Sequence, residues 1–140
     1  MADKYRVLID LNLILDALQQ RQPFYEFSAR LLAKAENQTI EGLISAHSVT
    51  TLFYLIAKDS SADLARGVLT QLLSFLQVAS VTQETIEQAL NLPYRDFEDA
   101  VQVIAALQSK ADYLVTRNPQ DYKPPIIPVL QPVELLALVS

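Results

Sequence analysis

Short apolar runs that end at a polar residue alternate along this chain with longer segments in which apolar residues recur every three or four positions. The short runs are typical of buried strands, and the longer spacing is typical of amphipathic helices. The pattern predicts strands at residues 5–9, 42–44, 77–81 and 112–116, with a short edge strand at 126–127. It predicts helices at residues 12–18, 24–36, 45–58, 62–75, 82–90, 96–109 and 133–139. Strands that alternate with helices favour an α/β fold whose parallel sheet is covered on both faces.

Acidic residues follow two of the predicted strands and begin one of the helices. Asp10 ends the apolar run 7–9, Asp121 lies in the turn after strand 112–116, and Asp96 and Asp99 open a helix. In parallel sheets the ligand site lies beyond the carboxyl ends of the strands, where the strand order reverses. If the two strands are neighbours, these carboxylates converge and repel, and a divalent cation among them relieves the repulsion. The sequence therefore predicts metal-assisted chemistry on phosphate.

Each acid also has a purely structural interpretation. Asp96 suits an N-cap, and the helix dipole favours an acid at Asp99. Asp10 can cap the helix that follows it, and Asp121 is a common type of turn residue. His47, the single histidine of the chain, is expected to be a helix-start residue. No one of these motifs is specific alone, and only their combination points to a site.

Composition narrows the candidate chemistry. The chain has 140 residues, 51% of them hydrophobic and 19% charged, which is typical of one globular domain spanning residues 1–140. Because it has no cysteine and one histidine, thiolate and multi-histidine sites are excluded, which leaves oxygen ligands and a hard ion such as Mg²⁺ or Mn²⁺. No apolar run reaches the roughly 18 residues of a membrane span, and no signal-peptide pattern is present, so we expect a cytoplasmic protein.

The formal net charge of −5 counts against strong non-specific binding of nucleic acid, since such binding depends mainly on cations that contact phosphates. Arg95, Arg117 and Lys123 nevertheless flank the acidic motifs, and Arg117 is a candidate for contact with a phosphate. The charge therefore weakens a nucleic-acid role without removing it.

Four blocks of sequence carry a more specific pattern. They are Val7-Leu8-Ile9-Asp10-Leu11-Asn12, Ile44-Ser45-Ala46, Asp96-Phe97-Glu98-Asp99-Ala100, and Leu114-Val115-Thr116-Arg117-Asn118 with Asp121-Tyr122. In this order, across nearly the whole chain, the blocks resemble the PIN-domain family, the fold of VapC-type toxin ribonucleases. The resemblance implies a three-layer α/β/α sandwich with a central parallel sheet, and a pocket of acids that holds Mg²⁺ or Mn²⁺.

The resemblance also implies which residues carry the chemistry. Asp10 and Asp99 match two of the metal-binding catalytic acids, and Asp121 falls in the block that supplies the last one. The supporting positions are Asn12, Asp96, Thr116 and Asn118. A metal held there would polarise a phosphodiester oxygen of RNA and lower the pKa of a bound water for in-line attack.

One position departs from the family pattern. Thr51 stands where the family commonly has a glutamate on the helix after the second strand, and Asp59 lies beyond the end of that helix. The missing acid indicates a divergent branch. Two functions remain open. The first is a metal-dependent endoribonuclease that acts as a toxin and is inhibited by an antitoxin. The second is a PIN fold that has lost catalysis and binds nucleic acid or protein. A phosphatase that uses Asp10 as nucleophile, resembling the haloacid dehalogenases, is disfavoured because Asn12 replaces the second aspartate of Asp-x-Asp.

Helices 24–36 and 62–75 contain more apolar residues than one buried face requires. Excess apolar surface on a small domain usually marks an interface, so we expect a homodimer through these helices. The family resemblance implies the same arrangement, with the two acidic pockets on one groove and an antitoxin docked nearby.

Overall fold

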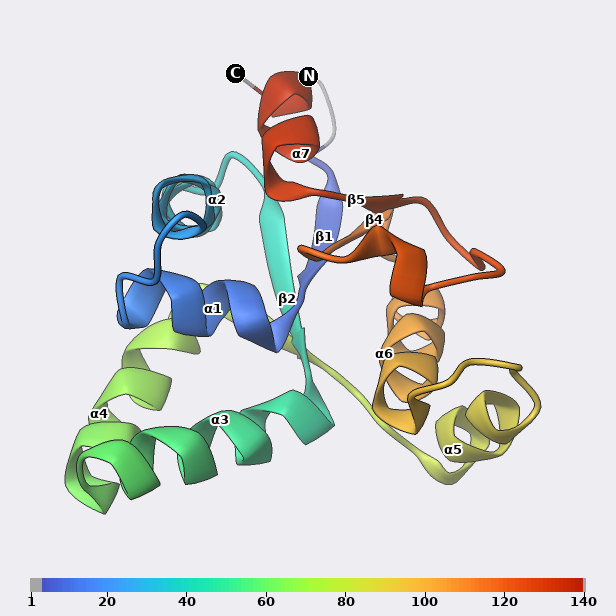
Figure 1. Ribbon diagram of the computed structural model, residues 1–140, viewed down its shortest axis with the longest axis horizontal. Helices are drawn as coiled ribbons and strands as arrows, with labels where there is room; N and C mark the ends of the chain where they lie inside the picture. The colour runs from blue at the N-terminus through green and yellow to red at the C-terminus, as the bar shows by residue number, and fades with distance from the viewer. Residues whose placement is uncertain (1–3, 140) are drawn as a thin grey trace.

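The computed structural model describes residues 4–139 and has a five-stranded, entirely parallel sheet at its centre. The strands are β1 (Arg6–Ile9), β2 (Glu41–Ser45), β3 (Leu76–Ala79), β4 (Tyr113–Val115) and β5 (Val129–Leu130). They lie in the order β3-β2-β1-β4-β5 (Figure 1). The helices are α1 (Leu11–Leu18), α2 (Tyr25–Glu36), α3 (Ala46–Asp59), α4 (Ala62–Leu72), α5 (Gln83–Leu90), α6 (Phe97–Gln108) and α7 (Pro132–Val139), and a short 3-10 helix, η1, covers Pro119–Asp121.

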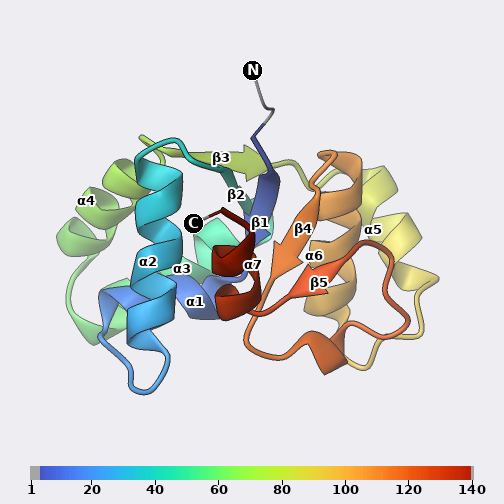
Figure 2. The same cartoon turned by 90° about the horizontal axis from the view of Figure 1, so that it is seen from above.

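Helices cover both faces of the sheet, so the predicted α/β/α sandwich is confirmed. Seen from above, helices α1 to α4 and α7 lie on one side of the strands, and α5 and α6 lie on the other (Figure 2). Alternate side chains of each strand point to opposite faces. Val7 and Ile9 of β1 join one core and Leu8 joins the other, and Val115 and Leu114 of β4 divide in the same way. This is why the central strands are apolar at successive positions.

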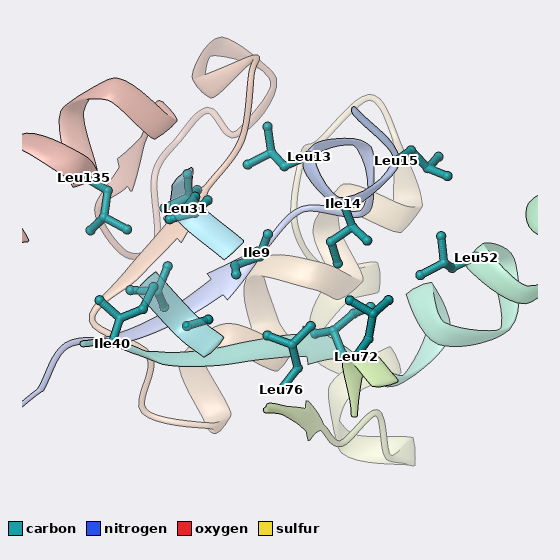
Figure 3. Close-up of a cluster of buried hydrophobic side chains, with 14 of the residues drawn as sticks. Ile9, Leu13, Ile14, Leu15, Leu31, Ile40, Leu52, Leu72, Leu76 and Leu135 are labelled. Atoms are coloured by element: carbon teal, nitrogen blue, oxygen red, sulfur yellow. The ribbon is translucent and has the colours of Figure 1, made fainter. Parts of the chain in front are cut away.

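The larger core lies between the sheet and helices α1 to α4 and α7. Figure 3 shows Ile9 of β1 among the side chains of this cluster, together with Leu13, Ile14 and Leu31. All four side chains are fully buried. Gly42 of β2 packs closely against β3 and α2, because a Cβ built there would be 2.6 Å from Leu76 Cδ2 and 3.0 Å from Ala35 Cβ.

The predicted edge strand at residues 126–127 is wrong. The fifth strand forms three residues later, where Val129 and Leu130 pair with β4, and Ile127 instead buries its side chain in the smaller core. Prolines surround residues 126 and 127, and proline has no N–H to give to a ladder. Pro128 contributes only its carbonyl, which accepts a hydrogen bond of 3.1 Å from the Leu114 N–H.

The apolar surplus on α4 is smaller than the sequence suggested. Leu72 and Leu76 are buried in the larger core of the same chain, and Val68 and Leu69 pack against it. Among the large apolar side chains of this region, Leu64 and Leu73 remain the exposed ones. In residues 4–139, no helix is long and apolar enough to span a membrane.

The chain reverses direction across the sheet at β1. From β1 it moves to β2 and β3 on one side, and it later returns to β4 and β5 on the other. The carboxyl ends of β1 and β4 therefore lie side by side at the point where the strand order reverses, with Ile9 paired to Val115. In parallel α/β sheets this is the usual position of a ligand site.

Candidate functional site

Asp10 is the first residue after β1, and β4 holds it in place. Its backbone N–H donates to the Val115 carbonyl at 3.0 Å. One carboxylate oxygen, Oδ2, accepts a hydrogen bond of 2.7 Å from the Thr116 hydroxyl, and Thr116 itself is buried. The other oxygen accepts the longer N-cap bond, 3.4 Å, from the Asn12 N–H. Asp10 thus caps α1 and also presents an oriented carboxylate at the end of the sheet.

Asp96 and Asp99 have different functions at the start of α6. Asp96 is the N-cap, and its Oδ1 accepts a hydrogen bond of 2.9 Å from the Glu98 N–H. The cap leaves Asp99 free for another contact, and its Oδ1 accepts a hydrogen bond of 3.1 Å from the Tyr122 hydroxyl. The interpretation of Asp96 as an N-cap is therefore correct, and Asp99 lies in the first turn of α6, where the helix dipole favours an acid.

The carboxylates line two adjoining cavities. A pocket of about 110 Å³ is lined by Asp10, Asn12, Asp96 and Asp99, among others. A wider cleft of about 420 Å³ shares Asp96 and Asp99 with it and adds Arg95, Gln120, Asp121 and Lys123. Of the three acids predicted as ligands, Asp10 and Asp99 therefore line the pocket, and Asp99 and Asp121 line the cleft.

Thr116 and Asn118, two of the predicted supporting residues, lie in the segment after β4. The Thr116 hydroxyl joins the segment to Asp10 and accepts a bond of 3.3 Å from the Asn118 N–H. The Asn118 side chain is exposed, where its Oδ1 accepts a bond of 3.4 Å from Gln120, and it lines neither acidic cavity. Asn118 thus shapes the turn.

The pKa of Asp99 is raised from its ordinary value of 3.8 to about 6. Partial burial is the largest cause, and the neighbouring Asp96, Asp10 and Asp121 raise the pKa further, while the hydrogen bond from Tyr122 lowers it. Within residues 4–139, the four ion pairs involve other acids, so no arginine or lysine neutralises this group. The neighbouring carboxylates thus disfavour the ionised form of Asp99.

The donor set suits a hard divalent cation bound by few protein ligands. In the described part of the chain, no group of three or more acidic or histidine side chains is close enough together to hold a metal ion. The acids therefore do not form a closed carboxylate cage. Mg²⁺, however, keeps several of its waters and commonly binds through one or two carboxylates. Asp10 and Asp99, oxygen donors without a cationic partner, fit that mode, and Asp121 lies farther along the cleft.

His47 contributes to the site, although its sequence context predicts only a residue at the start of a helix. It is the second residue of α3 and lines the pocket with Asp10 and Asp99. Its Nδ1 and the Ser45 hydroxyl form a hydrogen bond. Burial lowers the pKa of the imidazole, and the nearby Glu98 opposes that shift. A lone histidine has no local signal for this position, which depends on α3 and α6 meeting in space.

Thr51, at the position of the missing glutamate, turns its hydroxyl toward its own helix. The hydroxyl donates to the His47 carbonyl at 3.2 Å. Helix α3 thus presents His47 and Ser48 to the pocket and contributes no carboxylate to it.

Arg117, the predicted phosphate contact, has other partners. Its Nε lies 3.0 Å from Asp16 Oδ2, and its guanidinium stacks on the Phe24 ring at 4.1 Å. Asp16 is fully buried on α1, and Arg21 lies 3.8 Å from its other oxygen. Arg117 thus ties the segment after β4 to α1 and lies outside the acidic cleft, where Arg95 and Lys123 are the cations.

The protein thus has an α/β fold with a parallel sheet. Its candidate site lies at the carboxyl ends of β1 and β4, where the strand order reverses. The chain belongs to the PIN-domain family, because the PIN domain family model matches residues 6–120. No curated protein matches the sequence significantly.

Solved structures share the fold at low sequence identity. A toxin–antitoxin complex from Klebsiella pneumoniae superposes with a TM-score of 0.68 and 22% identity, covering 90% of this chain and 97% of that chain. VapBC-1 from nontypeable Haemophilus influenzae gives 0.67 and 13%, covering 91% and 98%. VapC20 from Mycobacterium tuberculosis, described as a toxin that cleaves the sarcin-ricin loop, gives 0.60 and 16%, covering 77% and 86%.

Proposed function

We propose that this chain is a metal-dependent endoribonuclease and the toxin of a toxin–antitoxin pair. The observation that carries the proposal is the pair of carboxylates at the reversal of the strand order. Asp10 is held by the Thr116 hydroxyl and Asp99 by the Tyr122 hydroxyl, and both line one pocket. Membership of the PIN-domain family and the fold shared with toxin–antitoxin complexes support the same function.

In the proposed reaction, Asp10 and Asp99 would hold Mg²⁺ or Mn²⁺. The ion, when bound, supplies Lewis acidity toward a phosphodiester oxygen and lowers the pKa of a nearby water. Asp121, exposed on the cleft, would accept a hydrogen bond from a water in the cleft and orient it. The Thr116 and Tyr122 hydroxyls keep the two carboxylates in place through the reaction.

Arg95 and Lys123 are the proposed contacts for the RNA backbone. Both are exposed and line the same cleft as Asp99 and Asp121. Phosphate contacts position a nucleic acid without reading its sequence. These two cations therefore take the role that the sequence assigned to Arg117. An antitoxin that covers this cleft would restrain the enzyme, and a homodimer through α2 and α4 would place two such clefts in one assembly.

The decisive experiment is cleavage of a mixed single-stranded RNA pool by the protein with Mg²⁺ or Mn²⁺ and with EDTA. We expect fragments with either metal and none with EDTA. Asp10→Asn should abolish cleavage, because it removes a ligand charge. Asp63→Asn, an exposed aspartate in the first turn of α4, is the matched control and should cleave like the original protein. RNA that stays intact with metal, or an equally active Asp10→Asn protein, would contradict the proposal.

A second function is favoured by one observation, the absence of a carboxylate from the α3 side of the pocket. The Thr51 hydroxyl bonds to its own helix and supplies no ligand to the pocket. If that loss prevents catalysis, the protein is a catalytically impaired PIN fold that binds nucleic acid or protein. In the same assay, retention of RNA by the protein without any metal-dependent fragments would favour this alternative.

A further inference from the structure

Tyr122 is buried between the two carboxylates of the site. It follows η1, and it is 2% exposed. The hydroxyl donates to Asp99 Oδ1 at 3.1 Å, and the charges of both Asp10 and Asp99 act on the phenol. A phenylalanine would fill the same space in the smaller core. The hydroxyl thus adds nothing to apolar packing, and its contact with Asp99 calls for another explanation.

Gln102 determines the direction of that hydrogen bond. It lies on α6, one turn after Asp99, so both side chains point to the same side of the helix. Its Nε2 donates to the Tyr122 oxygen at 2.6 Å, and the residue is 4% exposed. An amide NH₂ can only donate. The Tyr122 oxygen is therefore the acceptor in this bond, and its own proton goes to Asp99.

The Tyr122 ring is itself held firmly. The Tyr94 ring packs edge-on against it, with the two ring centroids 6.1 Å apart. The Tyr94 hydroxyl donates to the Pro124 carbonyl at 2.7 Å, which fixes the chain just after Tyr122. These contacts hold the Tyr122 hydroxyl in place, so it can orient the more exposed Asp99 side chain.

We infer that Tyr122, oriented by Gln102, is a positioning residue that sets the direction of the Asp99 carboxylate toward the metal. The hydrogen bond occupies Oδ1 from the protein side. Within residues 4–139 no hydrogen bond reaches Oδ2, so Oδ2 would be the oxygen available to the metal. Partners that orient a ligand in this way typically change metal affinity 10- to 100-fold when they are removed. This inference rests on the proposed metal site and adds two residues, Gln102 and Tyr122, to which the sequence patterns assign no role.

The test compares Mn²⁺ affinity by titration calorimetry in Tyr122→Phe, Gln102→Leu and the matched control Tyr113→Phe. Tyr113 is a partly buried tyrosine of β4 that packs on Tyr5, and it lines neither acidic cavity. We expect about 10-fold weaker binding for Tyr122→Phe, a smaller loss for Gln102→Leu, and none for Tyr113→Phe. Melting temperatures without metal separate this effect from a general loss of stability, because destabilisation alone leaves the affinity of the folded protein unchanged.

A metal-free measurement keeps the inference separate from the proposed function. In crystals grown with EDTA, the Asp99 side chain should occupy one rotamer in the original protein and more than one in Tyr122→Phe. If the original protein binds no Mn²⁺ but Asp99 becomes mobile in the variant, the proposed function fails and the positioning role stands. An unchanged Asp99 rotamer in Tyr122→Phe, or unchanged Mn²⁺ affinity where the original protein binds, overturns the inference.

Discussion

The raised pKa of Asp99 makes a quantitative prediction for Asp99→Asn. An acid whose pKa is raised by folding binds its proton more tightly in the folded state, so the free energy of unfolding falls as the pH rises through the interval between the two values. For Asp99 that interval runs from 3.8 to about 6. Each pH unit of difference corresponds to about 1.4 kcal/mol, so the charged carboxylate costs up to about 3 kcal/mol above pH 6.

Two effects reduce this figure. Asp99 is partly exposed, so solvent screens part of the repulsion from its neighbours. It also lies in the first turn of α6, where the helix dipole stabilises a negative charge by about 0.3–1 kcal/mol. We therefore expect Asp99→Asn to raise the metal-free free energy of unfolding by about 1–2 kcal/mol at pH 8 and to leave it unchanged near pH 4. For a domain of this size the gain at pH 8 is about 3–8 °C in melting temperature.

The assay is urea denaturation of both proteins in EDTA at pH 4, 6 and 8. The introduced amide can still accept the Tyr122 hydrogen bond through its carbonyl oxygen, so the substitution removes charge and little else. Asp63→Asn is the comparison, because it removes an exposed charge in the first turn of α4, away from Asp99, and should bring no such gain. A loss of stability for Asp99→Asn at pH 8, or a difference that does not vary with pH, would refute the reasoning and assign Asp99 a structural role. If Asp99 is a ligand, Asp99→Asn should also abolish metal binding.

Three further predictions concern the rest of the molecule. Arg117→Met keeps a side chain over Phe24 but leaves the buried Asp16 with Arg21 alone. It should cost about 2–4 kcal/mol in urea denaturation at pH 8. The loss should shrink as the pH falls, because burial raises the pKa of Asp16 and its protonated form needs no cationic partner; a loss that does not vary with pH would mean that packing dominates. Gly42→Ala should lower the free energy of unfolding by about 1–3 kcal/mol in the same assay, because its Cβ would meet Leu76 and Ala35. Gly67→Ala on α4 has no atom within 4 Å of the new Cβ and should raise the free energy of unfolding by about 0.5–1 kcal/mol. Similar effects of the two substitutions would rule out the close approach at β2. Light scattering at about 50 µM, well above a micromolar dissociation constant, should give the mass of a dimer. The double substitution Leu64→Glu and Leu73→Glu should convert that dimer to a monomer. A monomer mass for the original protein would exclude the predicted interface.

The sheet could be predicted from the sequence because its signals are local. Apolar runs of strand length, such as residues 7–9, end at polar residues, and the capping acid Asp96 stands directly before its helix. These features depend on neighbours in the chain. The short strand β5 was misplaced because its position depends on which backbone N–H groups the prolines leave free, and on the burial of Ile127 in a core built by distant segments.

Parts of the candidate site could not be predicted from local patterns. Asp16 interrupts an apolar stretch of α1, which suggests an exposed face, yet it is fully buried because Arg117 reaches it from the segment after β4. Tyr122 belongs to one of the four sequence blocks but has no role assigned there, and its contact with Asp99 becomes visible only when α6 and the segment after η1 are placed together. In both cases the partner is distant along the chain, and no spacing rule connects the two.

The order of the strands also determines when the pocket comes into being during synthesis. Thr116, which holds Asp10, follows it by 106 residues, and Tyr122 is made later still. While the chain is growing, β1 can pair with β2, but its other edge stays open until β4 arrives. Contacts that close such long loops form slowly. A nascent chain that ends before Tyr122 therefore lacks the oriented pair of carboxylates. The proposed nuclease could act on the message that encodes it only after that residue has been made.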